Sequence, residues 1–287
     1  MHFWWDVRNV RAWGDFSLET ILSIPNFTEL LNLSIPAPAL PNPIRFPQNP
    51  ETVCSLHDMY TEFYAFKVNA ALKVALGTPH MTIRPHKAHP GARQLPDFVS
   101  NYESDYERTI YGDGRGRVVG LVRTFDRWNT GMRADTGPSS KIEYLRELSH
   151  LHKHMREHSC RYGFLITEIE LVCVRAGTDV VPLFGLVEVA PSIRLNAQGP
   201  GQLTAGLALW YLHMLAKNTP LQGQCGWRLD VGGPAALTRQ NCLERDDWMI
   251  KPEGKEKREA KRSRGWVFPD EPLSRKECGR PKRWSRS

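Results

Sequence analysis

Short apolar runs of strand length and longer apolar stretches with helical spacing follow one another along the chain. Several runs are rich in branched and aromatic residues and are bounded by polar residues, glycine or proline, a pattern typical of β-strands. They span residues 96–100, 117–126, 161–167, 169–175 and 182–190. Only Glu168 separates the third run from the fourth, so we expect these two strands to form a tight β-hairpin.

Three stretches have the apolar spacing of helices. Residues 51–77 repeat apolar side chains on one side of a helix, and residues 141–158 do the same with Ser140 as the expected N-cap. Residues 202–217 are apolar nearly all round, which predicts a buried helix. His213 within it is expected to be a hydrogen-bonded core residue rather than a ligand.

Composition divides the chain into an arm with a proline-rich connector, a core domain, a C-terminal extension and a basic disordered tail. These segments span residues 1–50, 51–220, 221–250 and 251–287. Prolines at almost every second position of residues 35–47 favour an extended connector. The last segment is polar, rich in lysine and arginine and interrupted by proline, so disorder is the expectation there.

The net charge of +7 comes from residues 251–287, because basic and acidic residues are equal in number in the preceding part of the chain. A dedicated duplex-DNA-binding domain gains most of its affinity by neutralising phosphates, so a neutral body is not typical of that class. Within the tail, Arg280, Lys282 and Arg283 are candidate nucleic-acid contacts in a Gly-Arg-Pro sequence similar to the core of an AT-hook. A nuclear import signal or a merely solubilising tail fits the same residues.

The six cysteines are scattered, without a Cys-x-x-Cys pair. This argues against a zinc ribbon and a disulfide scaffold, and favours reduced thiols in an intracellular compartment, the nucleus or the cytoplasm. The chain has no apolar run of membrane-spanning length, and its first residues do not have the pattern of a secretory signal. We therefore expect no membrane contact, and the sequence leaves the oligomeric state open.

The order of helix, strand with Pro-Asp, strand, helix, hairpin and strand resembles the αβββαβ core of the PD-(D/E)XK nuclease superfamily. More narrowly, residues 51–218 are similar to a fungal family of PD-(D/E)XK nuclease-like proteins. The segments that carry this resemblance are 95–99, 119–128, 161–175 and 207–215. The resemblance implies an α/β fold with a restriction-endonuclease-like αβββαβ core, in which helices flank a mixed central sheet.

In that superfamily two carboxylates hold a divalent ion, usually magnesium, and a lysine on the same strand face assists the attacking water. Asp97 matches the Pro-Asp acid and is the candidate metal ligand and catalytic residue. Leu121 stands where the second acid belongs, and Arg123 stands where the lysine belongs. Leucine cannot bind a metal and arginine cannot act as a base, so a Mg²⁺ cofactor is doubtful.

A relocated carboxylate could restore the metal site, and Asp126 is the candidate closest in the sequence. Other candidates are Glu62, Glu143 and Glu188. Alternatively, Arg123 binds the carboxylate or phosphate of a ligand, or it pairs with Asp97 in place of the metal, since a guanidinium can replace a missing cation.

Three functions follow from these alternatives. The first is a catalytically impaired nuclease-like domain that binds nucleic acid, through its basic tail, or another protein. The second, which the resemblance permits, is an enzyme or accessory protein of a fungal secondary-metabolite pathway with a small-molecule substrate in the cleft. The third is an active Mg²⁺-dependent nuclease with a relocated acid. The aromatic residues Tyr102, Tyr106, Tyr111 and Trp128 fit stacking on bases or a ligand, or simple packing.

Three histidines lie at helical spacing in the stretch 141–158. His150, His154 and His158 share one helix face with charged neighbours, which favours a solvated face. A metal site or a pH-sensitive site is the alternative, because histidines four residues apart on a helix can bind one metal ion.

Overall fold

The computed structural model describes residues 2–40, 52–86, 94–109, 111–177, 185–218 and 245–264. The chain divides into two units, one spanning Met1–Cys225 and Leu243–Lys251 and the other Gly226–Cys242 and Pro252–Ser287. The first unit contains the sheet and the candidate site. In the second unit the structure describes the helix α9 (Gly254–Arg264).

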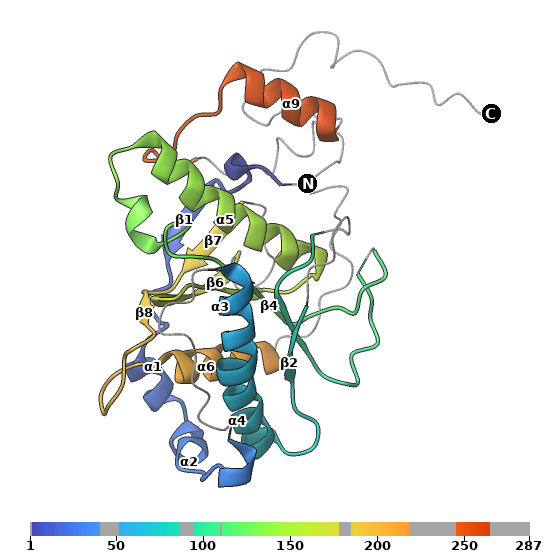
Figure 1. The fold of residues 1–287 in the computed structure, drawn as a ribbon, viewed down its shortest axis with the longest axis vertical. Helices are drawn as coiled ribbons and strands as arrows, with labels where there is room; N and C mark the ends of the chain where they lie inside the picture. The colour runs from blue at the N-terminus through green and yellow to red at the C-terminus, as the bar shows by residue number, and fades with distance from the viewer. Residues whose placement is uncertain are drawn as a thin grey trace, which may run out of the picture. The chain divides into compact units, whose positions relative to one another are not determined.

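A mixed eight-stranded sheet forms the centre of the first unit (Figure 1). Its strands are β1 (Asn9–Ala12), β2 (Thr82–Pro85), β3 (Phe98–Asn101), β4 (Val118–Val122), β5 (Tyr162–Ile166), β6 (Glu170–Ala176), β7 (Leu186–Val189) and β8 (Ile193–Arg194). The order is β1-β7-β6-β5-β4-β3-β2, and β8 pairs with β6 beside this path. The pairs β1–β7 and β4–β5 are parallel, and the other pairs are antiparallel.

Helices cover both faces of the sheet (Figure 1). The helix α5 (Pro138–Glu157) lies on one face, where Leu151 packs against Gly163 of β5. The other face carries α6 and a long helical segment that changes from α to π and back, together with two short helices. Their bounds are α1 (Leu18–Ser23), α2 (Phe27–Leu31), α3 (Val53–Met59), the π-helix η3 (Tyr60–Ala65), α4 (Phe66–Leu76) and α6 (Ala205–Asn218). Short 3₁₀ turns are η1 (Trp4–Asp6), η2 (Ala37–Ala39) and η4 (Thr130–Arg133).

The elements follow the αβββαβ order along the chain. The first helix is the segment of α3, η3 and α4, the three strands are β2, β3 and β4, and the last helix and strand are α5 and β5. The architecture expected from the sequence is therefore confirmed: a mixed sheet flanked by helices, with its elements in the αβββαβ order. The hairpin of β5 and β6 and the buried helix α6 are also confirmed. The strand β2 was not expected, and it supplies the third strand that the αβββαβ order requires.

The start of α5 differs from the sequence expectation. The helix begins at Pro138 with Gly137 as its N-cap, so Ser140 lies inside the first turn and bonds Asp135 through its hydroxyl, 2.7 Å away. Proline suits the first helical position because its missing N–H would have no partner there in any case. The proline therefore sets the start of the helix.

The segments outside the expected core contain more structure than their composition suggests. Residues 9–12 form the edge strand β1, so part of the expected N-terminal arm belongs to the sheet. Residues 254–264, within the segment expected to be disordered, form the helix α9. Most of the proline-rich connector and of the C-terminal extension lies outside the described residues. No helix in the described part of the chain has the length and apolar character needed to cross a membrane.

Strand β4 determines where the candidate site lies. All its residues are buried, and Val118 and Val122 join the core under α3, α4 and α6. Because strand side chains alternate between faces, Leu121 and Arg123, which comes directly after β4, point to the opposite face, toward α5. The end of β4 therefore places Arg123 between the sheet and α5.

Candidate functional site

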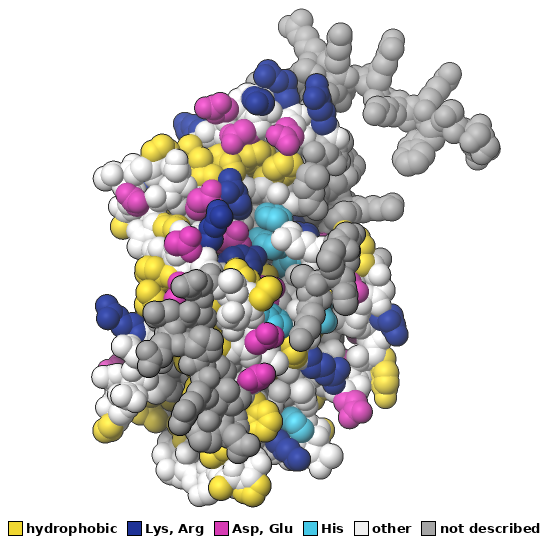
Figure 2. All heavy atoms as spheres, viewed as in Figure 1, with side chains coloured by type: hydrophobic (Ala, Val, Ile, Leu, Met, Phe, Trp, Pro, Cys, Tyr) yellow, Lys and Arg dark blue, Asp and Glu magenta, His cyan; other side chains and the backbone are white. Residues whose placement is uncertain are grey.

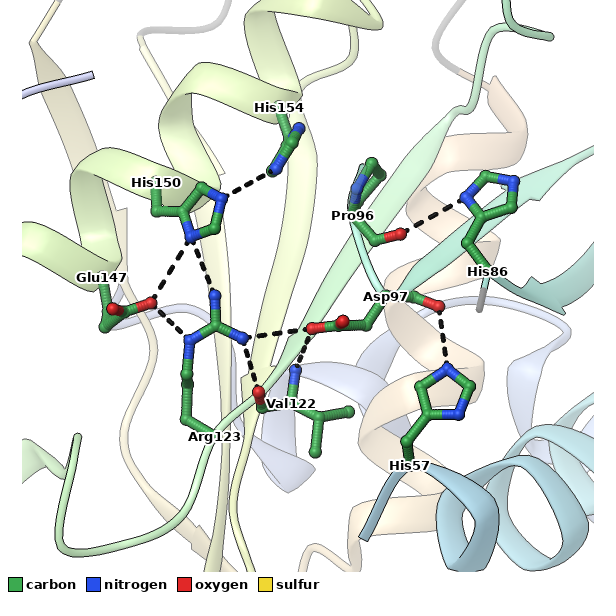
Figure 3. A network of polar contacts seen from close by, with 9 residues as sticks. All are labelled: His57, His86, Pro96, Asp97, Val122, Arg123, Glu147, His150 and His154. Atoms are coloured by element: carbon green, nitrogen blue, oxygen red, sulfur yellow. Dashed lines mark hydrogen bonds and ion pairs between the residues drawn. The ribbon is translucent and has the colours of Figure 1, made fainter. Parts of the chain in front are cut away.

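Asp97 and Arg123 meet where β4 ends. Because β3 runs antiparallel to β4 with Phe98 opposite Gly120, Asp97 lies beside the last residues of β4. The Asp97 Oδ2 accepts hydrogen bonds from the Val122 backbone N–H at 2.8 Å and from the Arg123 Nη1 at 3.2 Å (Figure 3). The pairing of Asp97 with Arg123, one of the alternatives left open by the sequence, is present in the structure.

A second carboxylate binds the same guanidinium from α5. The Arg123 Nε donates to Glu147 Oε2 at 2.5 Å, and its Nη1 also donates to the Val122 carbonyl at 2.5 Å. The Arg123 Nη2 lies 2.8 Å from the His150 Nδ1 (Figure 3). All three guanidinium nitrogens therefore have partners, and Arg123 bridges an acid of the sheet edge and an acid of the helix.

The electrostatics of Glu147 reflect this bridge. Burial alone would raise the pKa of Glu147, but the Arg123 guanidinium bonded to its Oε2 holds this pKa well below its usual range. Glu147 is therefore ionised over the whole physiological pH range. Glu147 was not among the acids proposed from the sequence.

The guanidinium also fixes the direction of a hydrogen-bond chain through α5. Arginine only donates, so the His150 Nδ1 at 2.8 Å must accept, and the Glu147 Oε2 at 3.6 Å from it is too distant for a hydrogen bond. The His150 Nε2 then carries the proton and donates to His154 Nε2 at 3.0 Å. His154 in turn donates from Nδ1 to Glu157 Oε2 at 3.0 Å. Both rings are neutral in this arrangement.

The expected solvated histidine face was wrong. The exposed fractions of His150, His154 and His158 are 3%, 0% and 1%. The N-terminal segment covers this part of α5, since His2 stacks on His150 with ring centroids 4.4 Å apart. His158 is held separately, with its Nδ1 accepting the Gly116 N–H at 2.9 Å.

Burial determines the charge state of these rings. It lowers the pKa of His150 and, together with the facing His150, lowers the pKa of His2 to about 3. The N-terminal segment and α5 thus enclose neutral imidazoles beside the Asp97–Arg123–Glu147 bridge.

Two further histidines hold the backbone at Asp97. The Asp97 carbonyl accepts from the His86 N–H at 2.8 Å and lies 3.3 Å from the His57 Nε2, while the His86 Nδ1 lies 3.3 Å from the Pro96 carbonyl. The His57 ring stacks on Phe98 at 5.0 Å. These contacts fix the Pro-Asp turn at the edge of the sheet, and Figure 3 shows the two ring contacts with the Pro96 and Asp97 carbonyls.

The residues at this site do not fit a magnesium ion. Within the described ranges, no group of three or more histidine, cysteine or acidic side chains is placed to hold a metal ion. Leu121 is 1% exposed and offers no ligand. The guanidinium of Arg123 lies between the two carboxylates that a cation would need, so the position of the cation is filled by a side chain.

The structure does not bring the other candidate acids to this bridge. Asp126 is exposed in the turn after β4, and Glu62 is exposed on η3. Glu143 pairs with Arg146, and Glu188 pairs with Arg175. The candidate nucleic-acid contacts Arg280, Lys282 and Arg283 lie outside the described residues.

The aromatic residues considered for stacking are divided. Trp128 is fully buried, stacks on Tyr144 at 5.8 Å and donates from Nε1 to the Tyr144 carbonyl at 3.2 Å, so it is a packing residue. Tyr106 and Tyr111 are exposed. The part of the surface seen in Figure 2 carries basic and acidic side chains intermixed over the first unit, as expected for a neutral body.

Comparison with known proteins gives one structural likeness. No protein-family model and no curated protein sequence matches the chain. The crystal structure of a candidate nuclease belonging to DUF820 from Anabaena variabilis matches with a TM-score of 0.31 and 15% sequence identity. The match covers 59% of this chain and 87% of that chain. The fold assignment rests on the order and direction of the strands given above.

Proposed function

We propose that this chain is a nuclease-fold protein that binds its target without metal-dependent hydrolysis. The observation that carries the proposal is the Arg123 guanidinium bridging Asp97 and Glu147. Hydrolysis of a phosphodiester on this fold needs a hard cation held by carboxylates, with coordination positions open to water and phosphate. A side-chain cation neutralises the same acids but can neither activate a water molecule nor act as a base.

The bridge also gives Asp97 and Glu147 a structural role that does not depend on catalysis. Each carboxylate is largely buried, and a buried charge without a partner is costly. With Arg123 between them, Asp97 and Glu147 join β3, β4 and α5 into one rigid corner. The former catalytic position then serves as a structural clamp.

Nucleic acid is the target that the charge distribution favours, with the basic C-terminal segment as the contact. The helix α9 presents Lys255 and Arg258 as exposed residues, and Lys257 is partly exposed. Contacts of this kind neutralise phosphates and give affinity without sequence preference. The neutral first unit would then contribute shape rather than charge.

Calorimetry with Mg²⁺ and Mn²⁺ and an assay of DNA cleavage test the loss of hydrolysis. We expect neither metal binding nor cleavage by the wild-type chain, and the same result for Asp97→Ala. Metal binding that disappears in Asp97→Ala, together with cleavage of DNA, would show that the guanidinium yields its place to a metal and would refute the proposal.

The salt dependence of DNA binding tests the role of α9. Replacing Lys255, Lys257 and Arg258 by glutamine should weaken binding and lower the slope of log K against log salt by about 0.9 for each phosphate that is no longer neutralised. The matched control replaces Lys73, Arg84 and Lys141 of the first unit by glutamine and should leave the slope unchanged. Equal slopes for both variants and the wild type would contradict the proposed role of α9.

A further inference from the structure

A cavity of about 410 Å³ lies apart from the Asp97–Arg123–Glu147 bridge and shares no lining residue with it. It is bounded by the π-helix η3, by the turn between β5 and β6, and by the residues around the end of β8. Met59, Phe63, Tyr64 and Ile169 supply apolar and aromatic walls. This volume and lining fall in the range of small-molecule sites, which are mostly apolar with a few placed polar groups.

The walls of the cavity are joined by hydrogen bonds and are therefore preformed. The Tyr64 hydroxyl donates to the Leu195 carbonyl at 3.5 Å, and the Leu195 N–H donates to the Ile169 carbonyl at 2.9 Å. The Tyr60 hydroxyl donates to the Thr167 carbonyl, and burial raises the pKa of Tyr60, so this phenol stays protonated. A π-helical turn is uncommon and is frequently found at functional sites.

Two charged groups of opposite sign face the cavity. Glu168 is fixed because its Oε2 accepts the Phe125 N–H at 2.8 Å, which leaves the other carboxylate oxygen for a ligand. The Arg194 side chain is exposed, and within the described part of the chain its guanidinium has no hydrogen-bond or ion-pair partner. A guanidinium that forms no ion pair and lies beside an aromatic wall is suited to a planar anionic group, which its two parallel N–H groups can bind.

We propose that this cavity binds a small aromatic carboxylic acid that also carries a hydroxyl or amino donor. The ring lies against Phe63 and Tyr64, the carboxylate pairs with Arg194, and the donor bonds Glu168. A simple anion fits less well, because the apolar walls would stay uncovered and Glu168 would repel it. The proposal is independent of the role of Asp97, so it stands whether or not the chain binds nucleic acid.

Ligand-observed NMR and calorimetry on the full chain test the proposal with 4-hydroxyphenylacetate and its neutral analogue 4-hydroxyphenylacetamide. We expect saturable binding of the acid at one site with a Kd on the order of a millimolar, as its size allows. The amide should bind about tenfold more weakly, because it lacks the charge-assisted pair with Arg194.

Three variants assign the binding to the cavity. Arg194→Gln should bring the acid down to the affinity of the amide, whereas the control Arg84→Gln, an exposed arginine on β2, should change nothing. Ile169→Trp should block both probes by filling the cavity, and since Ile169 is 45% exposed, the fold should tolerate the change. Absence of saturable binding, equal affinity for acid and amide, or binding unaffected by both Arg194→Gln and Ile169→Trp would overturn the proposal.

Discussion

At the scale of single residues, Arg123 determines the character of the site. Its side chain is 15% exposed, and the two carboxylates it bridges are also largely buried. Most of the energetic importance of such a bridge appears when one member is removed, because the remaining charges lose their partner in a poorly solvated place. The bridge is therefore more informative as a target for substitution than as a contribution to stability.

The substitution Arg123→Gln should lower the free energy of unfolding by about 2–4 kcal/mol, somewhat less than for a fully buried pair. It leaves Asp97 and Glu147 facing each other without a cation. Urea denaturation monitored by circular dichroism measures the change. Mg²⁺ should then stabilise the variant but not the wild type, because the carboxylates become available to a metal.

The control for this prediction is Arg146→Gln, which removes an exposed ion pair with Glu143 on the same side of the sheet. Exposed pairs contribute about 0–1 kcal/mol, so little change is expected. If Arg123→Gln is as stable as Arg146→Gln, then the bridge does not hold the site together.

The sequence predicts part of this site and not the rest, for physical reasons. Asp97 and Arg123 could be paired in advance because strand alternation and the Pro-Asp start place them on adjacent strand ends. Glu147 could not, since the rotation of α5 relative to the sheet is a tertiary property. The buried histidines were misjudged because their cover comes from far away: Ser149 bonds the Phe3 carbonyl, 146 residues earlier.

At the scale of elements, α5 is unusual in burying several histidines as neutral rings. Burial, helped by the neighbouring Arg156, lowers the pKa of His152 to about 3. In the unfolded chain this histidine titrates near 6.5. Its contribution to stability is therefore complete above pH 6.5 and falls as the pH drops toward 3, because only the unfolded state takes up the proton.

We therefore expect stability to fall steeply below pH 6.5, with His152 alone responsible for about 2 kcal/mol between pH 6.5 and pH 5. Urea titrations of the wild type and His152→Gln at pH 7.5, 6.0 and 5.0 measure the slope. In this range the unfolding of the variant should take up about one proton fewer than that of the wild type, so its free energy of unfolding should depend less on pH. The partly exposed His80, replaced in the same way, is the control, and a slope unchanged by His152→Gln would contradict the assignment.

The contact between β4 and β5 depends on Gly120. A Cβ at this position would overlap the Phe164 ring, which is directly opposite in the parallel register. Gly120→Ala should therefore destabilise the fold by about 1–3 kcal/mol, since a packed core resists added volume. Gly206→Ala in α6 meets nothing within 4 Å and should stabilise the helix by about 0.5–1 kcal/mol. Thermal denaturation of both variants measures the contrast, and equal Tm values would refute it.

The elements missed from the sequence have identifiable causes. The strand β2 is short, lies at the edge of the sheet and ends in Pro85, so its composition is that of a loop. The helix α9 is rich in lysine, arginine and glutamate, which indicate disorder by charge but favour helices by intrinsic propensity. The sequence did not predict β2 or α9, because in each segment the amino-acid composition indicated a different structure from the one that forms.

At the scale of the whole molecule, residues from both ends of the first unit complete the sheet edge at β1. The Asp246 carboxylate accepts the Val10 N–H at 2.8 Å and the Trp248 Nε1–H at 3.1 Å, and the Asp246 N–H donates to the Arg8 carbonyl at 2.9 Å. A short segment near residue 246 thus occupies an edge that would otherwise offer free backbone groups to another chain.

Asp246→Ala should uncover this edge. We expect a decrease of about 1–3 kcal/mol in the free energy of unfolding, because a backbone donor loses a charged acceptor. Hydrogen exchange at the Val10 amide should accelerate, and the variant should aggregate more readily. The exposed neighbour Asp247, replaced by alanine, is the control; protection of Val10 that is unchanged in Asp246→Ala would refute the role of this segment.

The parallel pairing of β1 with β7 also has a consequence for how the chain is made. The ribosome releases Asn9–Ala12 before the other strands of the sheet, yet their partner Leu186–Val189 follows only after most of the first unit. At common rates of synthesis, β1 waits on the order of ten to forty seconds before it can pair. During that interval its apolar and aromatic neighbours are open to chaperones and to other nascent chains, so yield in cells should depend more on translation speed than on equilibrium stability.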